Sequence, residues 1–442
     1  MKFDRFGQLK PRGAEGGEAF ARICPFSPSA ADEDELAADR FPGARRYDSA
    51  IGRYDAAYVG HVSEGHFRMG GSSGGMVSWV AAELLRQGRI DGVAHVTATT
   101  GPDAGEPLFH YAISRSVEDL TAGAKSRYYA VELSGVTREI ARRPGRYAIV
   151  GIPCFIKAVQ LLRREDPVLR QRIAYTLGLF CGHMKSARMV ESFAWQMGVT
   201  MAQVRSVDFR LKDPTRPANW YTASLGLENG ESRRQDWWSL ADGDWGAGFF
   251  QNSACDFCDD VVAETADISF GDAWVEPYSS DGRGTNVVVV RSPEIGELLR
   301  GAIADRRLAL TEVDASFIRQ TQAAGLRQRR EGLALRLARH RGLRLRKRVA
   351  GVDPGLSARR RLIYRLREWI SLWSHRVFFV ARLLRWPALY IGWARAVLGV
   401  YQAVTYSRGS LGLAVDRLER VTSRWRGPAK SPAPGRSRSP IR

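Results

Sequence analysis

The sequence contains little cysteine, with five in 442 residues. Five scattered cysteines are too few for a disulfide scaffold, so a small secreted disulfide-rich fold is excluded. An odd number that includes a C-x-x-C pair is more typical of metal or redox use in a reducing compartment. The first twenty residues contain no apolar core segment, so we expect no signal peptide and a cytoplasmic protein.

Acidic residues are scarce near the C-terminus. Residues 321–442 contain 28 Lys and Arg but only 5 Asp and Glu, a net charge of +23, whereas residues 1–320 carry a net charge of −4. The basic character of the chain therefore belongs to one segment. We call residues 1–320 the body and residues 321–420 the basic tail, and we do not expect the body to bind nucleic acid.

Several catalytic patterns are also missing. The sequence has no H-E-x-x-H motif, no Walker pattern and no Ser-His-Asp arrangement, so hydrolase and kinase functions have no support. No repeat with a period of 20–50 residues is visible, which excludes a solenoid or propeller.

The body alternates apolar runs of helical and strand character, which predicts an α/β (α+β) fold with mixed sheets in two lobes. Apolar residues recur at 3.6-residue spacing after a Gly-rich turn, and short apolar runs then predict strands. The segments that carry this pattern are MVSWVAAELLRQGRIDGVAHV, YAIVGIPC, RIAYTLGLFC, ADISFGDAW and TNVVVVRS.

Four of the cysteines fall where ligands for a metal centre are expected. Cys154 and Cys181 each follow an apolar strand, and Cys255 and Cys258 form the C-x-x-C pair. Four thiolates suit either a cubane iron–sulfur cluster or a structural zinc ion. Inert buried thiols at the strand ends and a redox dithiol at the pair are the alternatives, and spacing alone leaves cluster and zinc evenly balanced.

The Gly-rich turn GGSSGG precedes the first predicted helix of the body. Its glycines, Gly70, Gly71, Gly74 and Gly75, allow a ligand to approach the backbone, while Ser72 and Ser73 offer hydroxyl groups. The helix starting near Met76 directs its N-terminus toward this turn, which favours an anion such as a pyrophosphate. An ordinary capped turn is the alternative.

Four stretches together resemble the family of coenzyme F420 hydrogenase/dehydrogenase beta subunits, which are flavin and iron–sulfur proteins. They are GGSSGGMVSWVAAELLRQGRIDGVAHV, YAIVGIPCFIKAVQLL, YTLGLFCGHMKS and CDFCDDVVAETADISFGDAW. They occur in the family's order and span about residues 70–290.

The resemblance implies two bound cofactors and a hydride partner. It implies a [4Fe–4S] cluster held by Cys154, Cys181, Cys255 and Cys258. It also implies an FAD site at Gly71, Ser72, Ser73, Gly74 and Gly75, with Lys125 and Ser126 nearby, and coenzyme F420 as a hydride partner. Many relatives carry a ferredoxin-like run of paired cysteines that this chain lacks, so we expect electrons to come from a separate protein. Cys24 is similar to an N-terminal C-P of the family, and we expect it to be structural or vestigial.

Two other features of the body have competing interpretations. Asp267 and Asp272 form a carboxylate pair in sequence, but such acids more often hold turns near a cluster. His183 and Lys185 follow Cys181 and are candidates for proton delivery or for binding an acidic substrate, although an exposed loop is the more common arrangement.

The basic tail mixes Arg with Trp, Phe, Leu and Tyr but contains no uninterrupted apolar run of 18 residues. This pattern predicts amphipathic helices over about residues 327–405 that lie on an anionic membrane surface, at the inner face of the membrane. A spanning or re-entrant segment, a helix hairpin that docks a partner, and a nucleic-acid contact are the alternatives.

The predicted organisation has five parts: an N-terminal segment at 1–60, a flavin-binding domain at 61–150, an iron–sulfur domain at 151–320, the basic tail at 321–420 and a disordered end at 421–442. The leading hypothesis is an oxidoreductase in which FAD exchanges a hydride and the cluster passes single electrons to a protein partner. The alternative is a non-catalytic adaptor with a structural metal site, in a membrane-associated assembly such as one for polysaccharide biosynthesis. A zinc-bound structural domain is a third hypothesis.

Overall fold

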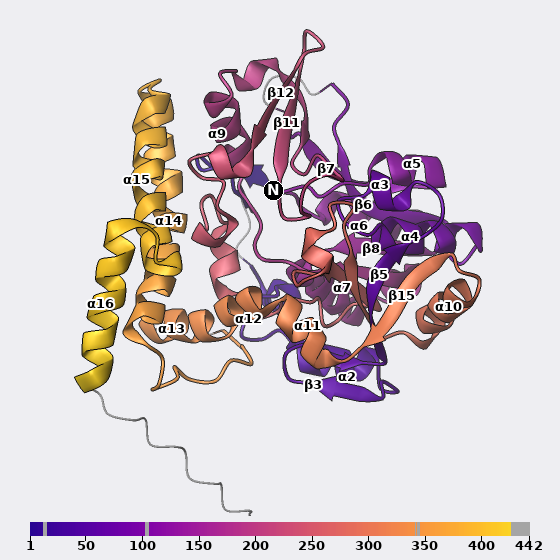
Figure 1. Ribbon diagram of the computed structural model, residues 1–442. Helices are drawn as coiled ribbons and strands as arrows, with labels where there is room; N and C mark the ends of the chain where they lie inside the picture. Colours follow the sequence, from indigo (N-terminus) through magenta and orange to yellow (C-terminus); the bar gives the residue numbers. More distant parts are fainter. Residues whose placement is uncertain (12–15, 102–105, 341, 343–344, 426–442) are drawn as a thin grey trace, which may run out of the picture.

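A mixed eight-stranded sheet forms the centre of the computed structural model, which describes residues 1–11, 16–101, 106–340, 342 and 345–425 (Figure 1). In spatial order its strands are β15 (Leu308–Val313), β5 (Ala56–Val62), β14 (Asn286–Val290), β13 (Ile268–Asp272), β9 (Ile173–Leu179), β8 (Tyr147–Gly151), β6 (Gly92–Ala98) and β7 (Phe109–Ser114). The four strands β13, β9, β8 and β6 pair in parallel, and the outer strands pair antiparallel. The predicted α/β class with a mixed sheet is confirmed.

Helices cover both faces of this sheet. They are α3 (Phe67–Gly70), α4 (Met76–Arg86), α5 (Val117–Ala122), α6 (Ser134–Arg142), α7 (Pro153–Glu165), α8 (Pro167–Arg172) and α10 (Pro293–Ala304). Strand β8 shows how the faces divide, because side chains alternate along a strand. Ala148 and Val150 pack in one core cluster, whereas Tyr147 and Ile149 pack in another with residues of α6 and α8.

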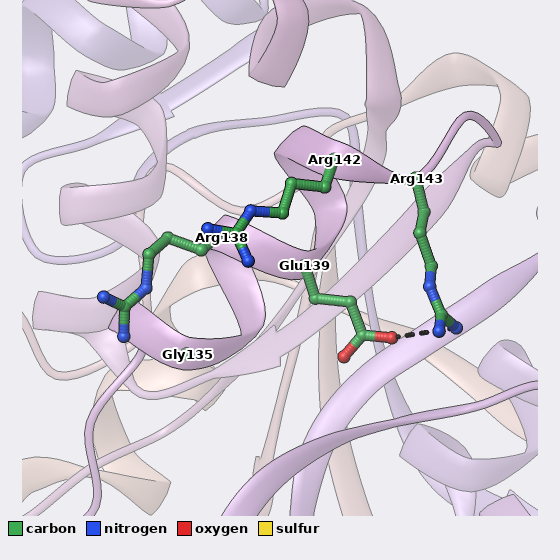
Figure 2. A pocket seen from close by; sticks show the side chains of 5 residues that line it. All are labelled: Gly135, Arg138, Glu139, Arg142 and Arg143. Carbon is green, nitrogen blue, oxygen red and sulfur yellow. Dashed lines mark ion pairs between the residues drawn. The ribbon is translucent and has the colours of Figure 1, made fainter.

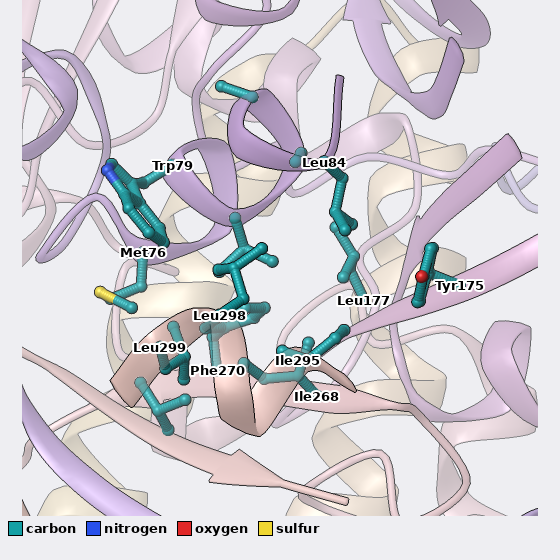
Figure 3. Close-up of a cluster of buried hydrophobic side chains, with 14 of the residues drawn as sticks. Met76, Trp79, Leu84, Tyr175, Leu177, Ile268, Phe270, Ile295, Leu298 and Leu299 are labelled. Atoms are coloured by element: carbon teal, nitrogen blue, oxygen red, sulfur yellow. The ribbon is translucent and has the colours of Figure 1, made fainter. Parts of the chain in front are cut away.

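The larger core lies between α4, α10 and the sheet (Figure 3). Met76, Trp79 and Leu84 of α4 face Ile295, Leu298 and Leu299 of α10 across residues of β9 and β13. Trp79 is fully buried, and its indole N–H donates to Glu64 at 2.6 Å. This packing fixes α4, and with it the Gly-rich turn that precedes α4.

Smaller elements complete the body. An antiparallel three-stranded sheet packs beside α9 (Arg188–Gln196) and contains β10 (Val204–Asp208), β11 (Thr222–Leu227) and β12 (Ser232–Asp236). The N-terminal part contains β1 (Lys2–Phe3), β2 (Leu9–Lys10), α1 (Glu18–Ile23), α2 (Glu33–Arg40), β3 (Arg46–Asp48) and β4 (Gly52–Tyr54).

The basic tail is helical, as its pattern predicted, but its apolar side packs on the body. Helix α11 (Ala315–Thr321) ends where the tail begins, and the helices that follow are α12 (Ala323–Arg329), α13 (Glu331–Arg339), α14 (Ala358–Leu383), α15 (Pro387–Tyr406) and α16 (Gly409–Trp425). In Figure 1, α14 and α15 run side by side along one flank of the body. Phe378 and Tyr390 are fully buried in the same cluster as Phe250 of the body. Much of the apolar surface assigned to a membrane therefore stabilises the fold, at about 1.5–3 kcal/mol for each buried side chain.

A buried polar group fixes the position of the hairpin formed by α14 and α15. The carboxylate of Asp242 accepts hydrogen bonds from the Tyr390 hydroxyl at 2.9 Å, from the Ser192 hydroxyl at 2.6 Å and from the Gln196 amide at 2.9 Å. A buried carboxylate needs hydrogen-bond donors around it. Because Tyr390 of α15 is one of these donors, the hairpin packs on the body in one specific position. Within the described ranges, no helix combines the length and the apolar character needed to cross a membrane.

The structure bears on two of the predicted domain boundaries. The central sheet takes strands from both sides of the boundary at residue 150, so the two predicted domains share one sheet. Helix α16 continues to Trp425, so the predicted disordered end does not begin at 421, and residues 426–442 lie outside the described part of the chain.

Candidate functional site

Two of the cysteines lie at neighbouring strand ends. Cys154 is the second residue of α7, directly after β8, and Cys181 follows β9. Because β8 and β9 are adjacent and parallel, their carboxyl ends meet at one edge of the sheet. The C-x-x-C pair joins them from a short 3-10 helix at Ser253–Phe257, which Cys258 terminates.

The four thiols are free and occupy one site. Burial, followed by the neighbouring Cys258, Cys255 and Cys181, raises the pKa of Cys154, and Arg329 acts in the opposite direction. Cys255 and Cys258 are buried, and Cys154 and Cys181 are partly buried. Cys24 ends helix α1 and is also a free thiol. The structure thus brings together the four cysteines that the sequence singled out.

Backbone groups hold these cysteines in place. The N–H of Met184 donates to the sulfur of Cys255 at 3.3 Å, and the N–H of Cys181 donates to the Val261 carbonyl at 2.9 Å. Burial raises the pKa of Cys255 to about 11, while Arg329 and the Met184 N–H act in the opposite direction. A neutral thiol is therefore favoured until a cation replaces the proton.

No group of three or more His, Cys, Asp and Glu side chains in the described residues converges closely enough to hold a single metal ion.

The acids that follow the C-x-x-C pair contact the basic tail. Asp259 pairs with Lys347 at 3.2 Å, and Glu264 accepts two hydrogen bonds from Arg348 at 2.7 and 2.8 Å. Arg336 donates to the Asp256 carbonyl at 2.7 Å. Nearby cations hold the pKa of Asp259 well below its usual value against the effect of burial. Part of the tail's positive charge therefore neutralises this loop.

The Gly-rich turn is explained largely by packing within the chain. Gly75 has φ +86°, and a Cβ there would lie 2.5 Å from the Phe67 carbonyl carbon. A Cβ on Gly74 would lie 2.8–2.9 Å from Asn286 and from the Gly60 carbonyl oxygen. The Asn286 side chain also accepts from the Met76 N–H at 3.2 Å, so it already occupies one helix N-terminal donor. A Cβ on Gly70, by contrast, would have no neighbour within 4 Å among the described residues.

The predicted flavin residues lie together. The backbone N–H of Ser126 donates to the Ser72 hydroxyl at 2.9 Å, which links the turn to the segment that contains Lys125. The Lys125 ammonium forms an ion pair with Asp208 at 3.2 Å. The Ser73 hydroxyl donates to the Thr285 carbonyl at 3.1 Å.

The structure adds a cationic group beside this turn that the sequence did not reveal. The Lys212 ammonium donates to the carbonyls of Ser73 and Arg283 at 2.8 and 2.7 Å, and also to that of Arg68. Burial, followed by the charges of Arg210, Lys125 and Arg68, lowers the pKa of Lys212 to about 7. Lys212 and Arg210 lie more than 80 residues from Lys125 and from the turn in sequence, and no motif surrounds them.

The two aspartates of ADISFGDAW have structural partners. Asp267 is buried and accepts from the Thr176 N–H at 2.8 Å and from the Thr176 hydroxyl at 2.7 Å. Asp272 pairs with Arg210 at 3.0 Å. Each of the two carboxylates is therefore engaged in a contact within the body.

The expectation of an exposed loop at His183 and Lys185 is wrong. Both side chains are buried. The His183 ring stacks on Trp245 with centroids 4.3 Å apart, and the Lys185 ammonium donates to the Phe249 carbonyl at 2.6 Å. Burial lowers the pKa of Lys185 to about 7.

Figure 2 shows a surface pocket on α6 lined by Arg138, Glu139, Arg142 and Arg143, together with Gly135. Glu139 and Arg143 form an ion pair at 3.3 Å. The pocket contains none of the predicted site residues.

Comparisons with known proteins match the body to two family models. Both describe the beta subunit of coenzyme F420 hydrogenase/dehydrogenase: residues 57–138 match the model of its N-terminal part, and residues 145–316 match the model of its C-terminal part. Together the matches cover more than half of the chain. The first includes the Gly-rich turn and the second includes all four cysteines of the site.

Two curated relatives are similar over part of their length. The chain is 27% identical over 247 residues to a coenzyme F420-dependent sulfite reductase of Methanocaldococcus jannaschii, covering 53% of this chain and 35% of that protein. It is 25% identical over 167 residues to one of the subunits of the F(420)H(2) dehydrogenase of Methanosarcina mazei, covering 38% of this chain and 40% of that protein. The chain thus spans two-fifths or less of the length of these relatives.

A solved structure is also similar. It is a chain of the F420-reducing [NiFe] hydrogenase complex from Methanosarcina barkeri, with 17% identity and a TM-score of 0.48, covering 64% of this chain and 92% of that chain.

Proposed function

Because this chain belongs to the family of coenzyme F420 hydrogenase/dehydrogenase beta subunits, we propose that it is an oxidoreductase subunit that binds FAD and a [4Fe–4S] cluster. It passes electrons between a protein partner and a hydride carrier such as coenzyme F420 or an organic substrate. The observation that carries this proposal is the gathering of Cys154, Cys181, Cys255 and Cys258 at one edge of the central sheet.

Four thiolates are the ligand set of a cubane cluster, and the family to which the chain belongs favours a cluster over a single zinc ion. In a cubane each thiolate binds a different iron, so the sulfurs surround the group without converging on one point. A zinc ion requires all four sulfurs at about 2.3 Å from one centre. The Met184 N–H that donates to the Cys255 sulfur is the kind of contact that tunes such clusters.

The surroundings of the Gly-rich turn fit the phosphates of FAD. Lys212, Arg210, Lys125 and Arg68 lie close enough for the last three to lower the pKa of Lys212. A bound anion would offset the repulsion among these four cations. When bound, FAD converts between hydride transfer and single-electron transfer. Ser72 links the turn to Ser126, and Lys212 holds the turn through its carbonyls.

The direct test is anaerobic purification followed by iron, sulfide and flavin assays and a visible spectrum. We expect about four irons per chain, a broad absorbance near ~400 nm and FAD that is released on denaturation. A colourless protein with one zinc and no flavin would contradict the proposal. It would favour the structural-metal adaptor, for which neither the family match nor the curated relatives give support.

FAD affinity is expected to fall as the pH rises through about 7. Lys212 has a pKa of about 7 in the protein without a ligand, and a bound phosphate favours its charged form. Binding therefore takes up a proton, and the dissociation constant increases above that pH. Flavin fluorescence titrations at about pH 6 and pH 8 measure the change. Lys212→Met should bind more weakly at the lower pH and lose most of the pH dependence, and an unaltered pH profile in this variant would show that Lys212 is not the group involved.

We further propose that the exposed side of the α14–α15 hairpin contacts an anionic membrane surface. Leu383 and Trp386 at its turn are 73% and 55% exposed, and Trp369, Leu372 and Trp373 are also exposed along α14. Arg376 and Arg385 are exposed among them. Aromatic and aliphatic side chains next to arginines suit the headgroup region of anionic lipids.

Sedimentation with vesicles tests this contact. We expect binding to vesicles that contain phosphatidylglycerol and little binding to pure phosphatidylcholine. Replacing Leu383 and Trp386 with serine should reduce binding at least about tenfold, because each side chain contributes about 1.5–3 kcal/mol when buried. Val168→Ser, which alters an exposed apolar residue on α8, is the control. Equal binding by both variants would exclude the hairpin.

A further inference from the structure

We propose that Arg329 is a positioning residue for the cluster that raises its reduction potential. Arg329 is the last residue of α12 and lies beyond residue 316, where the match to the family model ends. The residue is therefore supplied by the chain's own extension of the body. The inference rests on the proposed function, because it requires the cluster.

The guanidinium of Arg329 joins the loops that carry three of the four cysteines. One nitrogen donates to the Cys255 carbonyl at 2.5 Å, and the other donates to the carbonyl of Gly182, the residue after Cys181. The side chain is buried, with 2% of its surface exposed. Its Nε has no hydrogen-bond partner among the residues that the structure describes, so one donor is left over in the site.

Arg329 is also the cation shared by all four thiols. Burial lowers the pKa of Arg329, but the nearby Cys258, Cys255, Cys181 and Cys154 raise it above its usual value, and Arg329 in turn lowers the pKa of each of these thiols. Within the described residues it forms no ion pair with a carboxylate. Lys347 also lies near Cys258, but it is paired with Asp259 at 3.2 Å. The charge of Arg329 is thus available to the cluster.

The sign of the effect follows from the charge of the group. A cluster bound by four thiolates is anionic, and reduction adds one more negative charge. A fixed cation nearby stabilises the reduced form more than the oxidised form, and burial reduces the screening of that interaction by water. Arg329 therefore favours electron uptake.

Three variants test the inference. Arg329→Gln removes the charge, and Arg329→Lys retains it. Arg336→Gln alters a second buried arginine, which donates to the same loop at the Asp256 carbonyl and has no thiol among the main influences on its pKa. The measurements are iron content and the midpoint potential from an EPR-monitored redox titration. At the wild-type midpoint, Arg329→Gln should lower the ratio of reduced to oxidised cluster about tenfold, which is about 59 mV for one electron. Arg329→Lys should recover most of this shift, and Arg336→Gln should shift the potential less than Arg329→Gln does.

The outcomes separate the inference from the function on which it rests. A wild-type protein without iron contradicts the proposed function, and the inference with it. Four irons and an unchanged potential in Arg329→Gln would overturn the inference alone, as would equal shifts in the Gln and Lys variants. If Arg329→Gln fails to load iron, a loaded Arg329→Lys variant with the wild-type potential supports the role of charge. Loss of iron from both, with unchanged circular dichroism, would reduce Arg329 to a structural role.

Discussion

Replacing Cys255 and Cys258 together with serine is expected to lower the iron content from about four atoms per chain to less than about one, and to remove the absorbance near ~400 nm. The two residues supply half of the thiols of the site and come from a single turn. Cys154 and Cys181, at the ends of β8 and β9, cannot complete a four-ligand site alone. The measurement is iron and sulfide content after anaerobic reconstitution.

The matched control is Cys24→Ser. Cys24 is a free cysteine at the end of α1, and its sequence context predicted a structural role. We expect this variant to keep its iron and its spectrum. Full loading of the double variant would rule out the C-x-x-C pair as ligands, and iron loss on Cys24 replacement would show that the ligand set has been assigned wrongly.

The placement of Cys154 and Cys181 was predictable because strand ends are visible in a sequence. Apolar runs located β8 and β9, and parallel neighbours bring their carboxyl ends to the same edge. Neighbouring strands in the sequence pair often enough for this to be a sound expectation. The position of the C-x-x-C turn beside them came from the resemblance alone, since no periodicity places residue 255 next to residue 154.

The surroundings of the Gly-rich turn could not be predicted in the same way. Lys212 and Asn286 reach it from distant parts of the chain through long-range packing, and no local pattern marks either residue. The glycines themselves also had a second explanation. Gly74 and Gly75 are required by close contact with Gly60, Asn286 and Phe67, and a sequence cannot distinguish contact with a ligand from contact with another strand.

In the basic tail, too, the sequence pattern predicts helices but not the surface on which they pack. Amphipathic spacing predicts that a helix has an apolar side but does not identify the surface that this side covers. Here Phe378 and Tyr390 pack on the body, while Leu383 and Trp386 stay exposed. A run of positive charge likewise does not identify its partner. The sequence pattern predicted that the cations of the tail contact an external anionic surface, but several of them neutralise the acids that follow Cys258.

Arg348 is the tail cation whose loss is expected to affect stability most. Its two terminal guanidinium nitrogens donate to the two carboxylate oxygens of Glu264 at 2.7 and 2.8 Å, and its Nε lies 3.5 Å from a carboxylate oxygen of Asp259. The side chain of Arg348 is 9% exposed, and those of the two carboxylates are at most 1% exposed. Removing one partner of a buried ion pair leaves an uncompensated charge, whereas the intact pair itself contributes little. The tail thereby becomes necessary to the loop that carries the C-x-x-C pair.

We expect Arg348→Met to lower the free energy of unfolding by about 3–5 kcal/mol at about pH 7. Arg46→Met, which breaks the exposed pair with Glu312, should cost about 0–1 kcal/mol. Burial already raises the pKa of Glu264 and Arg348 opposes that rise, so the variant should raise it further. A carboxyl with a raised pKa in the folded state stabilises the protein when protonated, and this contribution is lost as the pH rises. The difference in the free energy of unfolding between Arg348→Met and the wild type, measured by urea denaturation, should therefore be larger at about pH 7 than at about pH 5. Equal losses for Arg348 and Arg46 would show that the tail does not hold this loop.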